Sequence, residues 1–268
     1  MAIDTSLFAA DIPAGTYAIG DVVQLTSVDG PANVRSGRGA AKLKNIVCAQ
    51  MLAAAPYWKI HVKNSDWIDD VQSFAGVIQN FPTVFDDDSG AVQNGHDDDL
   101  TPNSGWQIWA ECIIGGTSTS ANSIYTLIDI DYPQVSGVTD PKKAVGIPTS
   151  IAYNRTSVPV AAVGALVGSQ WDVVNVDYFK AGYRYVLDTV EMYGSQAGIN
   201  GFVAFSNAAG MGGLTRIIPI AAILSGVRYN VKYSSVLVKG PMDVKLKLFG
   251  TAGTANVFMC HDYVKQKA

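Results

Sequence analysis

The sequence contains little charge and few cysteines. Only 16% of its 268 residues are charged, whereas 48% are hydrophobic. We expect such a composition when much of a protein surface contacts other subunits. The net charge of −4 gives no indication of a nucleic-acid-binding protein, which would carry a basic surface. The three cysteines, Cys48, Cys112 and Cys260, are far apart. We therefore predict neither a disulfide framework nor a zinc site and interpret them as small buried residues.

Long hydrophobic runs and a targeting segment are also missing. The longest apolar stretches, 158–168 and 217–224, contain Gly or Pro and are shorter than the roughly 20 residues of a membrane helix. Residues 1–13 lack the basic start and the continuous apolar run of a signal peptide. We therefore expect a protein that folds in a reducing compartment.

Sequence signatures of catalysis are likewise absent. The chain contains no Gly-x-Ser-x-Gly elbow, no phosphate-binding loop and no His or Cys pair at metal-ligand spacing. Two Gly-x-Gly turns, at residues 37–39 and 210–212, lack the third glycine of a dinucleotide-binding fingerprint, so we interpret both as loops. We predict that the protein is not an enzyme and needs no cofactor, apart from a calcium ion considered at residues 86–99.

The main positive signal is alternation of apolar and polar residues with a period of two, which is typical of half-buried β-strands. Two strand–turn–strand segments, 104–132 and 225–250, follow this pattern after the same Ser-Gly pair. We predict that each is a β-hairpin in the centre of a sheet. The predicted core residues of the two hairpins are Trp106, Ile108, Ile128, Val227, Tyr229, Val231, Leu246 and Leu248.

The similarity of these segments predicts two tandem domains. Residues 136–156 contain prolines and no sustained alternation, which is typical of a domain boundary. We predict an all-β protein with two antiparallel, jelly-roll-like β-sandwich domains, residues 1–135 and 157–268, joined by a linker at 136–156. A few short helices are also expected, because residues 65–74 have apolar side chains at helical spacing.

The strand predicted at residues 58–65 contains one of only three histidines. Its alternation places Trp58, Ile60 and Val62 inward and His61 outward. We therefore interpret His61 as a solvated strand residue and not as a ligand.

The acidic segment 86–99, DDDSGAVQNGHDDD, contains six aspartates. Asp86, Asp88 and Asp97 loosely resemble the closely spaced oxygen ligands of a calcium-binding loop. The glycine stands one position early, however, and an Asp occupies the place of the bidentate Glu. The alternative is a solvated, self-repelling loop at an exposed apex that keeps the surface soluble. Both a calcium site and a solubility role therefore stay open.

Several segments together resemble a double jelly-roll major capsid protein: residues 12–25, the two predicted hairpins and the Pro-rich join at 133–148. The resemblance implies homotrimers whose six jelly rolls mimic a hexagon and build the icosahedral shell of a tailless virus or bacteriophage. It also implies location in the virion after assembly in the host cytoplasm, other virion proteins as partners and no catalytic residues. Whether a membrane lies beneath the shell is left open.

Two other functions stay open. The first is a phage decoration, spike or tail protein, which would be equally rich in β-structure. The second is a carbohydrate-binding β-sandwich, in which Trp109 or Tyr125 would supply an exposed aromatic platform.

The outward faces of the two predicted hairpins carry charges of opposite sign. We predict that the acidic flank of one domain meets the basic flank of another within an assembly, which would fix the register of the contact. The alternative is that the lysines protect exposed strand edges from aggregation. The predicted interface residues are Glu111, Asp129, Asp131, Arg228, Lys232, Lys245 and Lys247.

Overall fold

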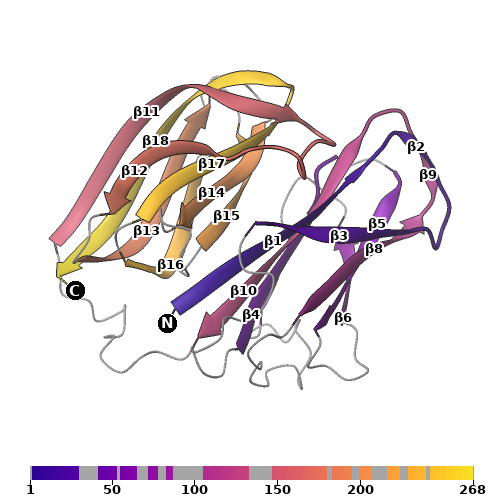
Figure 1. Cartoon of the computed structure of the whole chain (residues 1–268), viewed down its shortest axis with the longest axis horizontal. Coiled ribbons are helices and arrows are strands. Elements are labelled where there is room, and N and C mark those ends of the chain that lie inside the picture. The colour runs from indigo at the N-terminus through magenta and orange to yellow at the C-terminus, as the bar shows by residue number, and fades with distance from the viewer. Residues whose placement is uncertain are drawn as a thin grey trace. The chain divides into compact units, whose positions relative to one another are not determined.

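The computed structural model (Figure 1) is all-β in the part of the chain that it describes. No helix long and apolar enough to cross a membrane occurs among these residues. The chain separates into two compact units, a first unit of residues 4–133 and 162–169, and a second of residues 134–161 and 170–268 with the first three. The described residues are 2–29, 42–52, 55–64, 72–77, 83–86, 105–132, 147–179, 183–194, 199–206, 216–223, 229–239 and 242–267.

Among its described residues, the first unit has eight main strands in two antiparallel rows, β1–β10–β4–β7 and β3–β8–β5–β6. The bounds of these strands are β1 Ala2–Ile12, β3 Val22–Asp29, β4 Lys42–Gln50, β5 Tyr57–Asn64, β6 Gln72–Val77, β7 Thr83–Asp86, β8 Trp106–Ile114 and β10 Asn122–Tyr132. Two short strands, β2 (Gly15–Tyr17) and β9 (Gly116–Ser118), pair with each other. Strand β3 pairs with β8 through its first half and with β1 through its second half, which joins the two rows.

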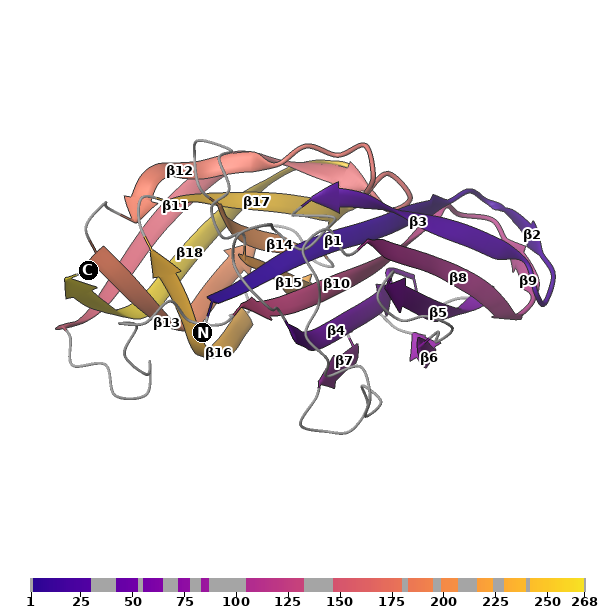
Figure 2. The same cartoon turned by 60° about the horizontal axis from the view of Figure 1, so that its bottom comes forward.

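The pairing of the first unit is nested, and this nesting defines a jelly roll. The first long strand, β1, lies beside the last, β10; β3 pairs with β8, β4 with β7, and β5 with β6. The chain therefore forms a doubled ribbon that folds over into two sheets. Figure 2 shows β2 and β9 together at the end of the unit where both arms of the ribbon bend.

The second unit repeats the same topology. Its strands pair in the nested order β11 with β18, β12 with β17, β13 with β16 and β14 with β15. The resulting rows are β11–β18–β13–β16 and β12–β17–β14–β15. The bounds are β11 Ile147–Ala162, β12 Asp172–Phe179, β13 Tyr183–Gly194, β14 Ile199–Ser206, β15 Arg216–Ile223, β16 Tyr229–Lys239, β17 Met242–Gly250 and β18 Gly253–Lys267.

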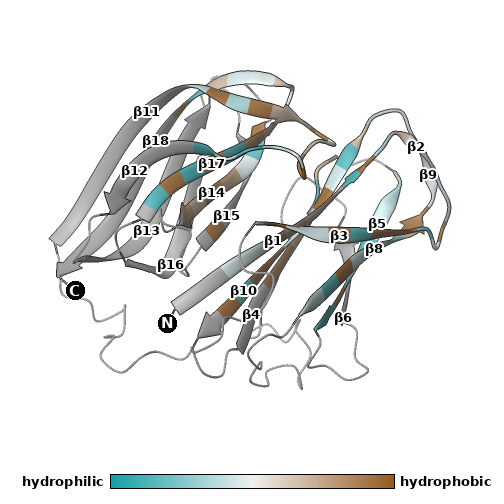
Figure 3. Cartoon of the chain, in the orientation of Figure 1, coloured by the Kyte–Doolittle hydropathy of each residue, from teal (hydrophilic) through white to brown (hydrophobic). Residues whose placement is uncertain are grey.

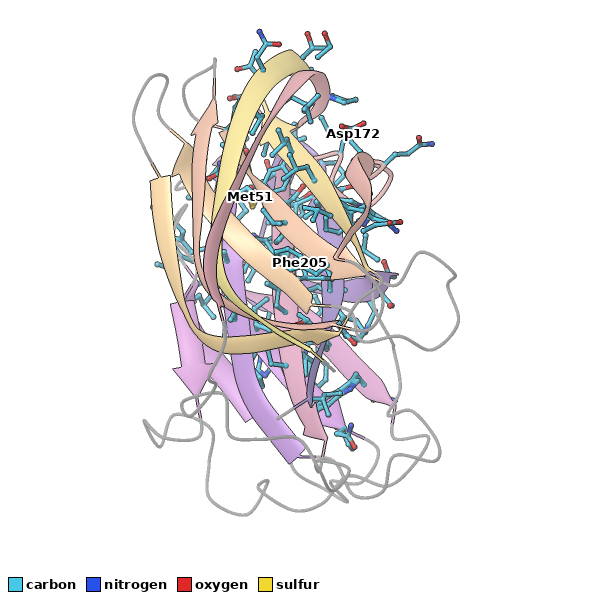
Figure 4. All side chains as sticks on the ribbon, turned by 90° about the vertical axis from the view of Figure 1, so that its left-hand side faces the viewer. Met51, Asp172 and Phe205 are labelled. Carbon is cyan, nitrogen blue, oxygen red and sulfur yellow. The ribbon has the colours of Figure 1, made fainter. Side chains whose placement is uncertain are left out.

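The cores follow the predicted alternation. Trp58, Ile60 and Val62 of β5 are fully buried, as predicted. Of the eight predicted core residues, Ile108, Ile128, Leu246 and Leu248 are buried and Trp106 is only partly buried. Tyr229 and Val231 lie in β16, but their side chains, like Val227 as a whole, are outside the described part. The alternation is visible along β17 in Figure 3, and the buried Phe205 of β14 is marked among the strands of its unit in Figure 4.

The two predicted hairpins are wrong, although their strands exist. Strand β8 lies between β3 and β5, whereas β10 lies between β1 and β4. Likewise β16 lies beside β13, and β17 between β14 and β11. Two strands that face one core from opposite sheets show the same inward alternation as two paired strands. The pattern therefore fixed the faces of the strands but not their partners.

The predicted linker and the predicted helix also differ from the structure. Residues 147–156 of the predicted linker form the first part of β11, and residues 136–146 lie outside the described part. Residues 72–74 of the predicted helix lie in β6, and the rest of that helix, residues 65–71, is not described. The short apolar sequence of β6 is stabilised as a strand by pairing with β5, a contact that helical spacing alone does not reveal.

Candidate assembly surface

The strongest candidate surface is the outer face of β3, β8 and β5 in the first unit, called here the β3–β8–β5 face. The strand register places Val22 and Lys59 on either side of Glu111. The next row, two residues along each strand, contains Gln24, Trp109 and His61. Residues of the opposite face, such as Ala110 and Ile60, are buried. Sheets of this kind bury one face and present the other.

His61 lies at the centre of the β3–β8–β5 face and contacts both Glu111 and Trp109. Its Nε2 atom lies 2.8 Å from Oε2 of Glu111. Its ring stacks on Trp109 with a centroid distance of 5.2 Å and an interplanar angle of 10°. The prediction that His61 is solvated is therefore wrong: the side chain is buried between its neighbours, while Glu111 is still 40% exposed. These contacts order the charged and aromatic groups of the face before any partner arrives.

Exposed aliphatic side chains adjoin this ordered centre. Val22 is 60% exposed, and Ile114, at the end of β8, is 48% exposed. Ile19 is 74% exposed and belongs to a loop that is fixed to β8, because the amide of Gly20 donates to the Cys112 carbonyl at 2.9 Å. Large exposed aliphatic groups beside polar ones are typical of surfaces that other subunits bury.

The corresponding sheet of the second unit differs, because the described side chains of β14 and β17 are buried on both faces, apart from the half-buried Lys245. On the face opposite Leu246, Phe202 and Phe249 are buried and their rings lie 5.6 Å apart. Lys247 is only 2% exposed, and its Nζ atom lies 5.3 Å from the centroid of the Trp171 ring. The sequence alternation had placed Lys247 on an outward face, and this prediction is wrong. A cation over an indole ring is favourable when both groups are shielded from water.

Asp129 is a second correction among the predicted interface residues. It is only 4% exposed, and its Oδ1 atom accepts a 2.7 Å hydrogen bond from the hydroxyl of Thr5. It therefore belongs to the interior of the first unit and not to an outward flank.

The remaining predicted interface residues have different outcomes. Glu111 lies on the β3–β8–β5 face, and Lys245 of β17 is half-buried. Asp131 and Lys232 lie in β10 and β16, but their side chains are outside the described residues, as is Arg228 as a whole. The acidic residues of this prediction belong to the first unit and the basic residues to the second. Their contact within an assembly stays a prediction.

The calcium prediction also stays a prediction. Asp86 is the last residue of β7 and pairs with Asn45, whereas Asp88 and Asp97 lie outside the described residues. Within the part of the chain that the structure describes, no three His, Cys, Asp or Glu side chains are placed to hold a metal ion.

The two aromatic residues considered as a carbohydrate-binding platform have different outcomes. Tyr125 is buried, so the prediction that it is exposed is wrong. Trp109 is partly exposed and stacks on His61 with one face of its ring, so its role as a platform stays a prediction.

Two of the three thiols are buried, as predicted. Burial raises the pKa of Cys48 to about 12, and a hydrogen bond from or to Thr126 offsets only part of this effect. Burial is also the main cause that raises the pKa of Cys112. Neutral thiols are poor nucleophiles and poor metal ligands, so both residues act as core side chains. The side chain of Cys260 is outside the described residues.

Comparison with known proteins finds distant structural similarities. No protein-family profile matches the sequence. No curated protein matches it either. Similar solved structures include the infectious bursal disease virus VP2 subviral particle, at 11% identity and a TM-score of 0.28, covering 97% of this chain and 67% of that one. Another is the PBSX exported protein XepA, at 9% identity and a TM-score of 0.25, covering 95% and 86%. The tandem CBM22 domains of Paenibacillus barcinonensis Xyn10C align at 9% identity and a TM-score of 0.22, covering 95% and 94%. Similarities at this level do not define a family.

Proposed function

We propose that the protein is a structural virion protein, a major capsid protein that assembles through homotrimers into an icosahedral shell. The observation that carries this proposal is the nested strand pairing of two consecutive jelly rolls in one chain. Three such chains supply six jelly rolls, the number needed for a pseudo-hexameric building block. The proposal includes no catalytic activity and no cofactor, and other virion proteins are the expected further partners.

The difference between the two units supports self-assembly. In the second unit, the described side chains of β17 and β14 are buried on both faces apart from the half-buried Lys245, whereas the β3–β8–β5 face of the first unit is open. The open face combines an exposed Val22 with a pre-ordered His61–Glu111 pair. In our proposal this face is covered when the next chain joins the trimer. In a closed ring of such head-to-tail contacts, every copy of the surface is buried by the neighbouring chain.

The test measures the mass of the purified protein by light scattering over a range of concentrations. The proposal predicts a species of three times the 28.4 kDa chain mass. Val22→Asp would place an uncompensated carboxylate in the contact, so its dissociation constant should rise at least tenfold, or about 1.4 kcal/mol. Ala252→Asp is the matched control, because Ala252 is an exposed turn residue of the second unit.

The outcomes separate the proposal from its alternatives. Monomeric wild-type protein at all concentrations would contradict assembly through trimers and would favour a decoration protein that binds a preformed shell. Equal dissociation constants for the Val22→Asp and Ala252→Asp variants would exclude the β3–β8–β5 face as the contact while leaving the trimer itself intact.

A further inference from the structure

Residues 162–169 run from the last residue of β11 towards β12, two strands of the second unit, yet they belong to the first unit. We call this segment the strap. The chain therefore leaves the second unit after β11, passes through the first, and returns before β12. A second segment thus joins the halves of the chain, in addition to the connection between Pro133 and Ile147.

The strap is held by the carboxylate of Asp11, near the end of β1. Oδ1 of Asp11 accepts a 2.8 Å hydrogen bond from the amide of Leu166, and Oδ2 accepts one of 3.0 Å from the amide of Val167. Oδ1 also accepts a 2.6 Å hydrogen bond from the Ser123 hydroxyl, whose oxygen in turn accepts the amide of Gly164 at 3.0 Å. Hydrogen bonds to a carboxylate are roughly twice as strong as those between neutral groups.

The sequence of the strap matches this position closely. The Leu166 side chain is fully buried. Gly164 has a φ of +89°, a conformation that L side chains rarely adopt, and a Cβ atom there would overlap Ala121. Two turns shape the segment, since the amide of Ala165 donates to the Ala162 carbonyl and that of Ser169 to Leu166. The strap therefore makes a specific contact with the first unit. The contact combines the buried side chain of Leu166, the required glycine at 164 and the Asp11 carboxylate, which accepts three hydrogen bonds.

We propose that the strap holds the two halves of the chain together through its non-covalent contacts, and that the Asp11 carboxylate anchors it. Through it the two halves of the chain stay associated even when the peptide connection between Pro133 and Ile147 is cut. The strap makes unfolding of the two jelly rolls cooperative, because the first unit is incomplete without residues supplied by the second half. This role does not depend on the proposed capsid function.

The test inserts a specific protease site between Pro133 and Ile147 of the full chain and cuts the folded protein. The two fragments of the otherwise unchanged chain should co-elute from a size-exclusion column under native conditions. Asp11→Ala should raise their dissociation constant at least tenfold. Asp21→Ala is the matched control, because Asp21 also accepts a backbone hydrogen bond, from Ala18 at 2.7 Å, but does not contact the strap.

Two further measurements keep the result decisive. Ser123→Ala removes only the hydroxyl bridge between Gly164 and Asp11, so it should weaken the association less than Asp11→Ala and serves if that variant does not fold. Calorimetry of the uncut chain should show one unfolding transition for the wild type and two for the Asp11→Ala and Ser123→Ala variants. Separation of the cut wild-type fragments would overturn the proposal, and so would equal dissociation constants for Asp11→Ala and Asp21→Ala.

Discussion

Lys247 provides the sharpest test of how charge is distributed in the second unit. The sequence pattern places Lys245 and Lys247 together on an outward face, whereas the structure leaves Lys245 half-buried and buries Lys247 beside Trp171. The two lysines should therefore respond differently to charge reversal. Lys247→Glu should destabilise the fold itself, and Lys245→Glu should leave the fold nearly unchanged.

The magnitudes follow from the contacts of Lys247. A shielded cation over an indole ring contributes about 2 kcal/mol. Lys247→Met keeps the apolar stem and loses this interaction, so the free energy of unfolding should fall by at least about 2 kcal/mol. Lys247→Glu also places an anion against the negative face of the ring in a buried site. That substitution should cost about 3–5 kcal/mol, the range typical of an uncompensated buried charge. Lys245→Glu should cost less than about 1 kcal/mol, as is usual for partly exposed positions.

The assay is urea unfolding of the four proteins, followed by tryptophan fluorescence at a concentration where all are in the same oligomeric state. From the highest to the lowest urea midpoint, the expected order is wild type, Lys245→Glu, Lys247→Met and Lys247→Glu. Equal midpoints for the two glutamate variants would refute the argument, since they would mean that Lys247 is solvated and not packed on Trp171.

Three further predictions concern the interior. Gly201→Ala should lower the free energy of unfolding by about 1–3 kcal/mol, because the new methyl group would overlap the carbonyl oxygen of Lys247. Thr5→Val should cost about 1–3 kcal/mol in the same measurement, because the buried Asp129 carboxylate loses a hydrogen-bond donor. The thiol of Cys48 should resist alkylation until the protein unfolds. Its pKa is raised from 9.0 to about 12, so the stability contributed by its neutral form is fully present below pH 9 and is lost as the pH rises towards 12.

Matched controls accompany these predictions. Gly168→Ala adds a methyl group where no atom lies within 4 Å, so it should leave the unfolding midpoint unchanged. Thr16→Val removes an exposed hydroxyl pair with Thr117 and should cost much less than Thr5→Val. Cys48→Ala should lose less stability than the wild type between pH 9 and pH 12. Equal effects of a core variant and its control, or rapid alkylation of Cys48 in the folded protein, would contradict the corresponding argument.

Sequence periodicity predicted the strand faces well because alternation is a local property. Ile108 and Leu246 are buried as expected, since a strand of either sheet turns every second side chain to the core. The partners of each strand could not be predicted in the same way. Nested pairing joins β1 to β10 over more than 100 positions, and most strands that are neighbours in the sequence, except β5 with β6 and β14 with β15, enter different rows.

The polar groups were harder to predict than the core. Asp129 and Lys247 occupy positions that alternation assigns to solvent. The described side chains next to them in β10 and β17 are buried on both faces of the strand, so alternation does not identify a solvent-exposed face there. Their partners, Thr5 and Trp171, are distant in sequence. The His61–Glu111 pair likewise depends on strand register, which no local pattern contains.

Negative-stain electron microscopy of the purified protein tests the central claim most directly. If the chain is a major capsid protein, concentrated samples should contain closed particles or flat hexagonal sheets built from trimers, and Val22→Asp should abolish them while Ala252→Asp should not. Small single particles at every concentration, which attach only to shells formed by another protein, would contradict the account.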